Sequence, residues 1–237
     1  MTESFWLNKK FMKNFIITID GPAASGKSTV AKLLAKKLGA GFLDTGAMYR
    51  AVTYAAMQSN IDLTKEEQLL DIIERKQFSF SIENNSMVVH LDGVDITELI
   101  REPNVTANAK YIASAPLVRR KLVQMQRQFA SEHKAIVTEG RDQGTVAFPN
   151  ADVKFFMSAN PQERARRRLA ELNAKGLNEN LEQIQESIEK RDKSDMERNV
   201  GPLKPADDAI IIDTTELDIE QVVEKLLGIV QEKGFSE

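Results

Sequence analysis

The residues with the most specific chemical meaning occupy positions 21–29, which read Gly-Pro-Ala-Ala-Ser-Gly-Lys-Ser-Thr. They fit the spacing G-x-x-x-x-G-K-[ST] of a phosphate-binding loop. The two glycines let backbone N–H groups come close to phosphate oxygens. Lys27 can lie along the β- and γ-phosphates, and the Ser28 hydroxyl can reach a Mg²⁺ ion. The segment therefore predicts a nucleoside triphosphate site lined by Gly21, Pro22, Ala23, Ala24, Ser25, Gly26, Lys27, Ser28 and Thr29.

The segments on either side of this loop have the structure that a phosphate site needs. Residues 15–20 form an apolar, β-branched run that predicts a buried strand, and residues 30–38 carry apolar side chains at helical spacing. A helix that begins at the loop places the positive end of its dipole beneath the phosphates. This context separates the motif from a glycine-rich turn that binds nothing.

The rest of the chain alternates between strand and helix patterns. We expect strands at 42–44, 134–138, 153–158 and 208–213. We expect helices at 45–58, 64–75, 104–114, 117–132, 181–195 and 218–232, and a further helix that begins at residue 161. The helix at 64–75 would open with a capping box formed by Thr64 and Glu67. Residues 78–82 and 87–91 alternate with period two around Asn84 and Asn85, which predicts an antiparallel hairpin.

These patterns predict an α/β fold, in which a parallel P-loop sheet has helices on both faces. We expect an N-terminal extension outside the fold at 1–11 and a core at 12–71 and 116–237 that includes a helical lid at about 164–198. Residues 72–115 would form an inserted antiparallel lobe.

Composition narrows the classes of function. The 237 residues carry a formal net charge of −3 and no cysteine, which excludes disulfides and thiolate metal sites. The charge gives no general attraction to nucleic acid or to an anionic membrane. No apolar stretch is long enough to cross a bilayer, and the first residues are too polar for a secretion signal. We therefore expect a cytoplasmic protein without nucleic-acid or membrane partners.

Polar side chains follow the predicted strands, where ligands bind in open α/β sheets. Thr45 and Arg50 come after the second strand, and Arg141 and Asp142 after the third. The arginines offer forked donors for phosphate oxygens. Glu139 ends the third strand and is a candidate to hold Mg²⁺ through water, together with Ser28.

Two basic helices are candidates for a lid. Each presents charged side chains on one face, namely Arg164, Arg167 and Arg168 on the first and Arg191, Asp195 and Arg198 on the second. Such a lid could exclude water and neutralise charge on a transferred phosphoryl group. The alternative is a pair of solvated helix faces with Glu–Arg pairs, and Arg166 is interpreted in that way. A switch GTPase is disfavoured, because no N-K-x-D segment follows any of the predicted strands at 134–138, 153–158 and 208–213.

Four segments together resemble the bacterial cytidylate kinases, from Met12 to the last helix. They lie at 21–29, 44–50, 140–145 and 191–195, with Pro202-Leu203 and 206–208 beyond them. The resemblance implies ATP-dependent phosphorylation of CMP and dCMP with Mg²⁺, by a monomer with a core, a lid and a CMP-binding insert. Taken with the loop motif and the helix-face spacing, it gives the candidate catalytic residues Lys27, Arg141, Arg164, Arg167, Arg191 and Arg198. It implies CMP contacts from Thr45, Tyr49, Arg50, Lys110, Arg119, Arg141, Asp142, Arg191 and Asp195.

Within this resemblance, Arg50 and Arg141 match positions that hold the acceptor phosphate, and Arg119 and Asp142 match positions that meet the cytosine. Lys110 stands where the family commonly has a serine, and Glu139 replaces the more usual aspartate. Chemistry supports the base assignment, since a carboxylate accepts from the cytosine amine and a guanidinium donates to N3 and O2. A kinase for UMP or dTMP, or a nucleotide-sensing module without turnover, are the alternatives.

Overall fold

The computed structural model describes residues 14–174 and 176–235, so the expected extension at 1–11 lies outside the described residues. Within these ranges, five strands form a parallel sheet in the order β2-β6-β1-β7-β8. They are β1 (Phe15–Asp20), β2 (Gly41–Asp44), β6 (Ala135–Gly140), β7 (Val153–Ser158) and β8 (Ile210–Asp213). The predicted parallel sheet is confirmed.

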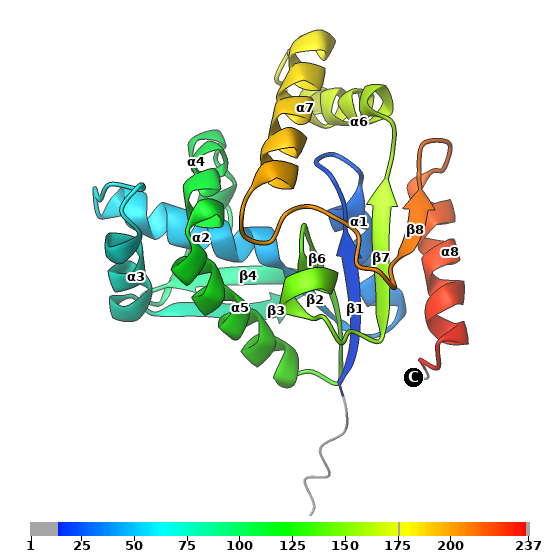
Figure 1. Ribbon diagram of the computed structural model, residues 1–237, viewed down its shortest axis with the longest axis horizontal. Coiled ribbons are helices and arrows are strands. Elements are labelled where there is room, and N and C mark those ends of the chain that lie inside the picture. Colours follow the sequence, from blue (N-terminus) through cyan, green and yellow to red (C-terminus); the bar gives the residue numbers. More distant parts are fainter. Residues whose placement is uncertain (1–13, 175, 236–237) are drawn as a thin grey trace, which may run out of the picture.

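Helices cover both faces of this sheet (Figure 1). One face packs against α1 (Lys27–Lys37) and α8 (Ile219–Glu232), and the other against α2 (Thr45–Gln58) and α5 (Pro116–Ser131). Side chains alternate between the two cores along a strand, as the pleat requires. In β6, Ile136 joins the core of α2 and α5, whereas Val137 joins that of α1 and α8. The predicted α/β class is therefore confirmed.

A small antiparallel sheet lies beside the parallel one (Figure 1). It contains β3 (Phe78–Glu83), β4 (Ser86–Leu91) and β5 (Val94–Asp95), flanked by α3 (Glu66–Arg75), η1 (Leu99–Arg101) and α4 (Pro103–Ser114). This is the predicted antiparallel insertion. Its buried side chains share one core with α2 and α5, and the expected boundary at residue 72 falls inside α3.

Two helices stand over the edge at which β1 and β7 end (Figure 1). They are α6 (Pro161–Ala174) and α7 (Leu181–Glu197), and they correspond to the expected lid helices. Their apolar side chains pack with Ala23 of the phosphate-binding loop. The two helices therefore rest on the loop as well as on each other.

Some local expectations were wrong. Helix α3 begins at Glu66, and the Thr64 hydroxyl donates to Asp62 Oδ1 at 2.7 Å instead of capping the helix. The expected capping box does not form, because Asp62 engages the Thr64 hydroxyl and the N-cap position falls on Lys65, whose side chain makes no capping hydrogen bond. A short π-helical turn, η2 (Gln143–Ala147), was not expected after β6.

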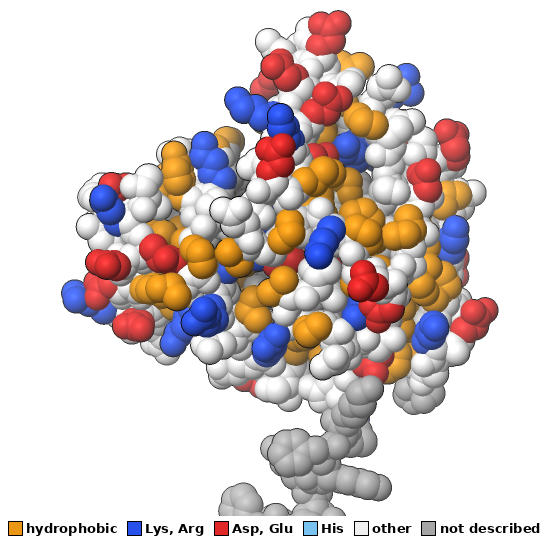
Figure 2. Space-filling model, in the orientation of Figure 1, with side chains coloured by type: hydrophobic (Ala, Val, Ile, Leu, Met, Phe, Trp, Pro, Cys, Tyr) orange, Lys and Arg blue, Asp and Glu red, His pale blue; other side chains and the backbone are white. Residues whose placement is uncertain are grey.

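The surface gives no sign of a single-signed binding face on the side drawn in Figure 2, where acidic and basic side chains are interspersed. None of the helices within 14–174 and 176–235 combines the length and the apolarity needed to cross a bilayer.

The shared core makes a prediction about cooperativity. Met87 lies on β4, is 2 % exposed and belongs to the core that includes α2 and α5. Met87→Ala should lower the free energy of unfolding by about 2–5 kcal/mol, the usual cost of such a cavity. Urea unfolding followed by circular dichroism should show a single shifted transition. A separate early transition would mean that residues 72–115 unfold independently.

Candidate active site

The predicted phosphate-binding loop connects β1 to α1, with Lys27 as the first residue of the helix. Gly21 lies so close to β7 that a Cβ atom there would overlap the carbonyl oxygen of Met157. Only glycine permits this approach. Ala24 has a left-handed backbone conformation, with φ of 57°. The loop is thus folded tightly between the sheet and the first turn of α1.

Lys27 lies in a crowded, cationic environment. It is 5 % exposed, and its Nζ donates to the Pro22 carbonyl oxygen at 3.0 Å. Burial, followed by the nearby Arg141 charge, lowers the pKa of Lys27 to about 7, and Arg191 contributes in the same direction. Burial, followed by the charges of Arg141 and Arg50, likewise lowers the pKa of Arg191. These four cations therefore share one region, in which an anion would relieve their mutual repulsion.

Ser28 and Glu139 meet beside the loop. The Ser28 hydroxyl donates to Glu139 Oε1 at 3.0 Å, so two hard oxygen ligands stand next to each other. Within 14–174 and 176–235, no group of three or more acidic or histidine side chains is placed to hold a metal. Mg²⁺ usually keeps several waters and takes further oxygens from substrate phosphates. The pair fits a Mg²⁺ ion that depends on a bound triphosphate.

A second cationic corner forms around Asp44 at the end of β2. Asp44 Oδ1 accepts the N–H of Ala47 and so caps α2, while Oδ2 pairs with Arg50 Nη2 at 3.3 Å. Arg101 Nη2, from η1, lies 4.0 Å from the same oxygen. Sequence reasoning missed Arg101, because a single arginine in the insertion carries no local signal. The Nε of Arg50 is buried and has no hydrogen-bond partner within 14–174 and 176–235, which leaves a donor for a ligand.

Charged side chains of alternating sign form a row beside the phosphate-binding loop. Arg119 pairs with Asp142, Asp142 Oδ1 lies 3.9 Å from Arg198 Nη2, and Arg198 Nη1 lies 3.6 Å from Asp195 Oδ1. Asp195 Oδ2 then accepts from Arg141 Nε at 2.8 Å. This row joins α5, the loop after β6 and the end of α7. The structure thereby brings together five of the predicted site residues.

The Arg119 end of the row is enclosed by the Tyr49 ring and by the backbone at Gly201. The Arg119 guanidinium carbon lies 5.5 Å from the centre of the Tyr49 ring. Burial raises the pKa of Tyr49 to about 12, so its phenol keeps its proton beside the Arg119–Asp142 pair. A Cβ atom on Gly201 would overlap the Arg119–Asp142 pair, which shows how closely the segment after α7 covers it. Among the residues that the structure describes, Arg119 Nε and Arg198 Nη2 have no hydrogen-bond partner and remain available as donors.

Comparisons with known proteins decide the family. The family profile described as Cytidylate kinase matches residues 17–232. The chain belongs to the cytidylate kinase family. Cytidylate kinases of Bacillus thuringiensis (strain Al Hakam) and Bacillus cereus (strain AH187) are each 50 % identical over 218 residues, which cover 92 % of this chain and 96 % of each relative.

A likeness among solved structures concerns the fold alone. An uncharacterized protein from Eubacterium ventriosum ATCC 27560 has a TM-score of 0.51 and 16 % sequence identity, covering 93 % of this chain and 99 % of that one.

Two residues that the cytidylate kinase resemblance assigned to CMP have other partners. Thr45 is buried, and its hydroxyl donates to the Glu139 carbonyl oxygen at 2.7 Å, so it joins the ends of β2 and β6. Lys110 is exposed on α4, with its Nζ 5.1 Å from the centre of the Tyr111 ring. In this arrangement, neither side chain extends the row of alternating charges.

The arginines of α6 fall into two groups. Arg164 is 5 % exposed, pairs with Asp192 and donates to the carbonyl oxygen of Ala159. Arg167 donates to the Thr214 carbonyl oxygen at 2.5 Å and braces the loop after β8. Both bond to groups of the protein itself, and Arg167 Nη1 also lies 4.0 Å from the position that a Cβ atom on Gly26 would take. Their role toward a transferred phosphoryl group stays a prediction. Exposed ion pairs occupy the other two, Arg166 with Glu163 and Arg168 with Glu171, as the solvated-face alternative predicts.

Asp20 supports the site from beneath and was missed by sequence reasoning. It ends β1, and its two carboxylate oxygens accept the backbone N–H groups of Gln143 at 2.8 Å and Gly144 at 2.7 Å. These amides follow Arg141 and Asp142 directly. The last residue of β1 therefore fixes the loop that carries both predicted acceptor contacts.

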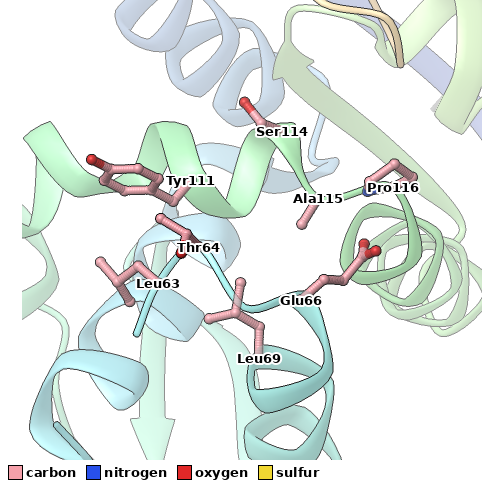
Figure 3. Close-up of a pocket in the computed structure, with 8 residues that line it drawn as sticks. All are labelled: Leu63, Thr64, Glu66, Leu69, Tyr111, Ser114, Ala115 and Pro116. Atoms are coloured by element: carbon pink, nitrogen blue, oxygen red, sulfur yellow. The ribbon is translucent and has the colours of Figure 1, made fainter. Parts of the chain in front are cut away.

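A pocket of about 350 Å³ lies between α3, α4 and α5 (Figure 3). It is lined by Leu63, Thr64, Glu66, Leu69, Tyr111, Ser114, Ala115 and Pro116. None of these is a predicted nucleotide contact. Glu66 accepts the N–H groups of Leu117 and Val118, which caps the helix that carries Arg119. Glu66, which lines the pocket, thus helps to hold the first turn of α5.

Asp20 generates a pH prediction. Burial raises its pKa to about 6, against the opposing effect of the two N–H donors, whereas the ordinary value is 3.8. Because the folded-state pKa is the higher one, protonation favours the folded state. This contribution is complete below about pH 3.8 and is lost as pH rises through about 6. One pKa unit corresponds to about 1.4 kcal/mol, so its full size is roughly 3 kcal/mol.

Asp20→Asn removes this titration. Free energies of unfolding from urea titrations between pH 3.5 and 7 should therefore show that the stability of the parent chain relative to the variant falls as pH rises. A difference that stays constant over this range would contradict the assigned pKa.

Proposed function

We propose that this chain transfers the γ-phosphoryl group of ATP to CMP and dCMP, giving CDP and dCDP, by in-line attack with Mg²⁺. The observation that carries the proposal is the row of alternating charges that runs from Arg141, beside Lys27, to the buried Arg119–Asp142 pair. A triphosphate at Lys27 and a monophosphate along this row would meet end to end. Membership of the cytidylate kinase family supports the same substrates.

On the donor side, residues 21–29 would bind the ATP phosphates through backbone N–H groups. Ser28 and Glu139 would hold Mg²⁺, Glu139 through water, and this ion would neutralise charge on the phosphate oxygens. Lys27 would lie along the β- and γ-phosphates. Its lowered pKa supports this role, because an anion in the loop restores the favourable environment of the ammonium group.

On the acceptor side, Arg50, Arg141 and Arg191 would bind the CMP phosphate, and Arg101 joins them on the evidence of its place at Asp44. Asp195 and Arg191 would approach the sugar. The attacking phosphate oxygen is already ionised at neutral pH, so no general base is needed. Catalysis would come from positioning and from charge neutralisation by Lys27 and the arginines.

The base would be read by Asp142 and Arg119. The Asp142 carboxylate accepts from the exocyclic amine of cytosine, and Arg119 offers N–H groups to N3 and O2. Uracil presents a carbonyl in place of that amine, so an acceptor would face an acceptor. A site that buries such an unmatched group rejects the analogue strongly.

The assignment of the two nucleotide sites also gives a role to each part of the chain. Residues 72–115 would be the CMP-binding lobe, and the helices within 164–198 would be the lid over both nucleotides. We further propose that the protein acts as a cytoplasmic monomer without nucleic-acid or membrane partners.

Lys27→Ala tests the donor site. Turnover should fall below detection, while the fold remains intact, because the one hydrogen bond of the Lys27 side chain within 14–174 and 176–235 goes to the Pro22 carbonyl oxygen of the same loop. ADP release in a coupled assay should be measured with CMP, dCMP, UMP, dTMP and AMP at one ATP concentration, with thermal unfolding as the control for folding. Wild-type turnover in the variant would contradict the role of Lys27. Activity confined to UMP or dTMP would overturn the substrate, and no turnover by the parent chain would favour a sensing module.

Asp142→Asn tests base recognition. An amide cannot present two acceptor oxygens, so the specificity constant for CMP should fall by about 100-fold or more, as expected when a buried polar match is lost. The affinity for ATP, measured by calorimetry, should change little. Glu171→Gln, which breaks only an exposed ion pair on α6, is the matched control. An unchanged preference for CMP over UMP would remove Asp142 from base recognition.

A further inference from the structure

The phosphate-binding loop is attached to the lid helices by a buried ion pair. Arg164 of α6 and Asp192 of α7 pair with each other, and each is 5 % exposed. Asp192 Oδ1 accepts the N–H of Ala23 at 2.9 Å, and Arg164 Nη1 donates to the Ala23 carbonyl oxygen at 3.0 Å. Both peptide groups that flank Ala23 are therefore held by the lid.

The next residue explains what this attachment can do. Ala24 adopts φ of 57°, a left-handed conformation that an L-residue with a Cβ atom reaches only at a cost. Such a conformation persists where the surrounding structure enforces it. The carbonyl that Arg164 binds belongs to the peptide between Ala23 and Ala24, directly before the strained residue.

Apolar packing acts at the same place. Ala23 and Ala24 contact a small cluster formed by Ala165 of α6 and by Ile184 and Ile188 of α7, among others. The loop is thus held by polar and apolar contacts from both helices. Neither Arg164 nor Asp192 belongs to the row of charges on the acceptor side. Their contacts with the substrate-binding region are those with Ala23 of the phosphate-binding loop.

We infer that Asp192, together with Arg164, is a positioning residue that keeps the phosphate-binding loop in its strained, ligand-ready conformation. The inference rests on the proposed binding of ATP to this loop. Without the pair, the loop relaxes at Ala24 and is ready only part of the time. The apparent dissociation constant for ATP then rises in inverse proportion to the fraction of molecules whose loop is still ready.

The rival explanation is a buried ion pair that only stabilises the lid, since breaking such a pair is strongly destabilising in itself. The two explanations differ at Ala24. Glycine adopts the left-handed conformation without steric cost. If the pair serves to hold that conformation, its removal should matter much less when residue 24 carries no Cβ atom.

The experiment is a double-mutant cycle on ATP binding without CMP. The dissociation constant of Mg-ATP is measured by calorimetry for the parent chain, Asp192→Asn, Ala24→Gly and the double variant. Asp192→Asn should weaken binding about tenfold in the parent background, and by about threefold or less in the Ala24→Gly background. Glu171→Gln on α6 is the control and should bind as the parent does.

Each outcome decides the inference. Unchanged affinity in Asp192→Asn, or an equal loss in both backgrounds, overturns it. If Asp192→Asn does not fold, as judged by circular dichroism and thermal unfolding, Arg164→Lys replaces it in the same cycle under the same criteria. Failure of the parent chain to bind Mg-ATP overturns the proposed function instead, so the two failures can be told apart.

Discussion

Mutual repulsion among cations crowded at one edge of the sheet is the constraint on which the rest of this structure depends. Burial and the charges of Arg141 and Arg191 lower the pKa of Lys27, and burial and the charges of Arg141 and Arg50 lower the pKa of Arg191. In a low-dielectric cleft, such charges are costly unless carboxylates separate them. The fold supplies Asp44, Asp142 and Asp195 between the arginines. These carboxylates balance the positive charges of the arginines while no anionic ligand is bound.

The same constraint separates two kinds of arginine. Arg50, Arg119 and Arg198 each keep a buried N–H group that makes no hydrogen bond within the described residues. Arg164 and Arg167 are bonded to backbone carbonyl oxygens and carboxylates of the protein itself. A spare buried donor equips an arginine to recognise a ligand, whereas the bonds of Arg164 and Arg167 to backbone carbonyl oxygens brace the chain. Burial alone does not make this distinction, because Arg119 and Arg164 are both almost fully buried.

Backbone amides provide the other support for the site. Asp20, Glu66 and Asp192 each accept N–H groups from a segment distant in sequence, respectively the loop after β6, the start of α5 and the phosphate-binding loop. Each of these segments carries, or directly adjoins, residues that we assign to a nucleotide. A carboxylate that accepts backbone donors fixes a loop more firmly than apolar packing alone, because the hydrogen bond is charge-assisted and directional.

The sequence by itself determined the parts that depend on neighbouring residues or on strand order. The phosphate-binding motif is contiguous, so its glycines, Lys27 and Ser28 could be recognised without a structure. Parallel strands end at one edge, so Glu139, Arg141 and Asp142 could be placed near that motif. The insertion and the two lid helices were visible in their periodicities, and the likeness of four segments to the cytidylate kinases agreed with the family comparison.

Only the tertiary structure decided which partner each charged group takes. Helical spacing places Arg164 and Arg167 on one face of α6, but it cannot say that the face meets Asp192 and Thr214 rather than a phosphate. Arg101 and Asp20 act on groups that are distant in the chain and carry no local pattern. Partner choice depends on distances between packed elements and on competition for buried donors and acceptors, and the order of residues along the chain does not encode these directly.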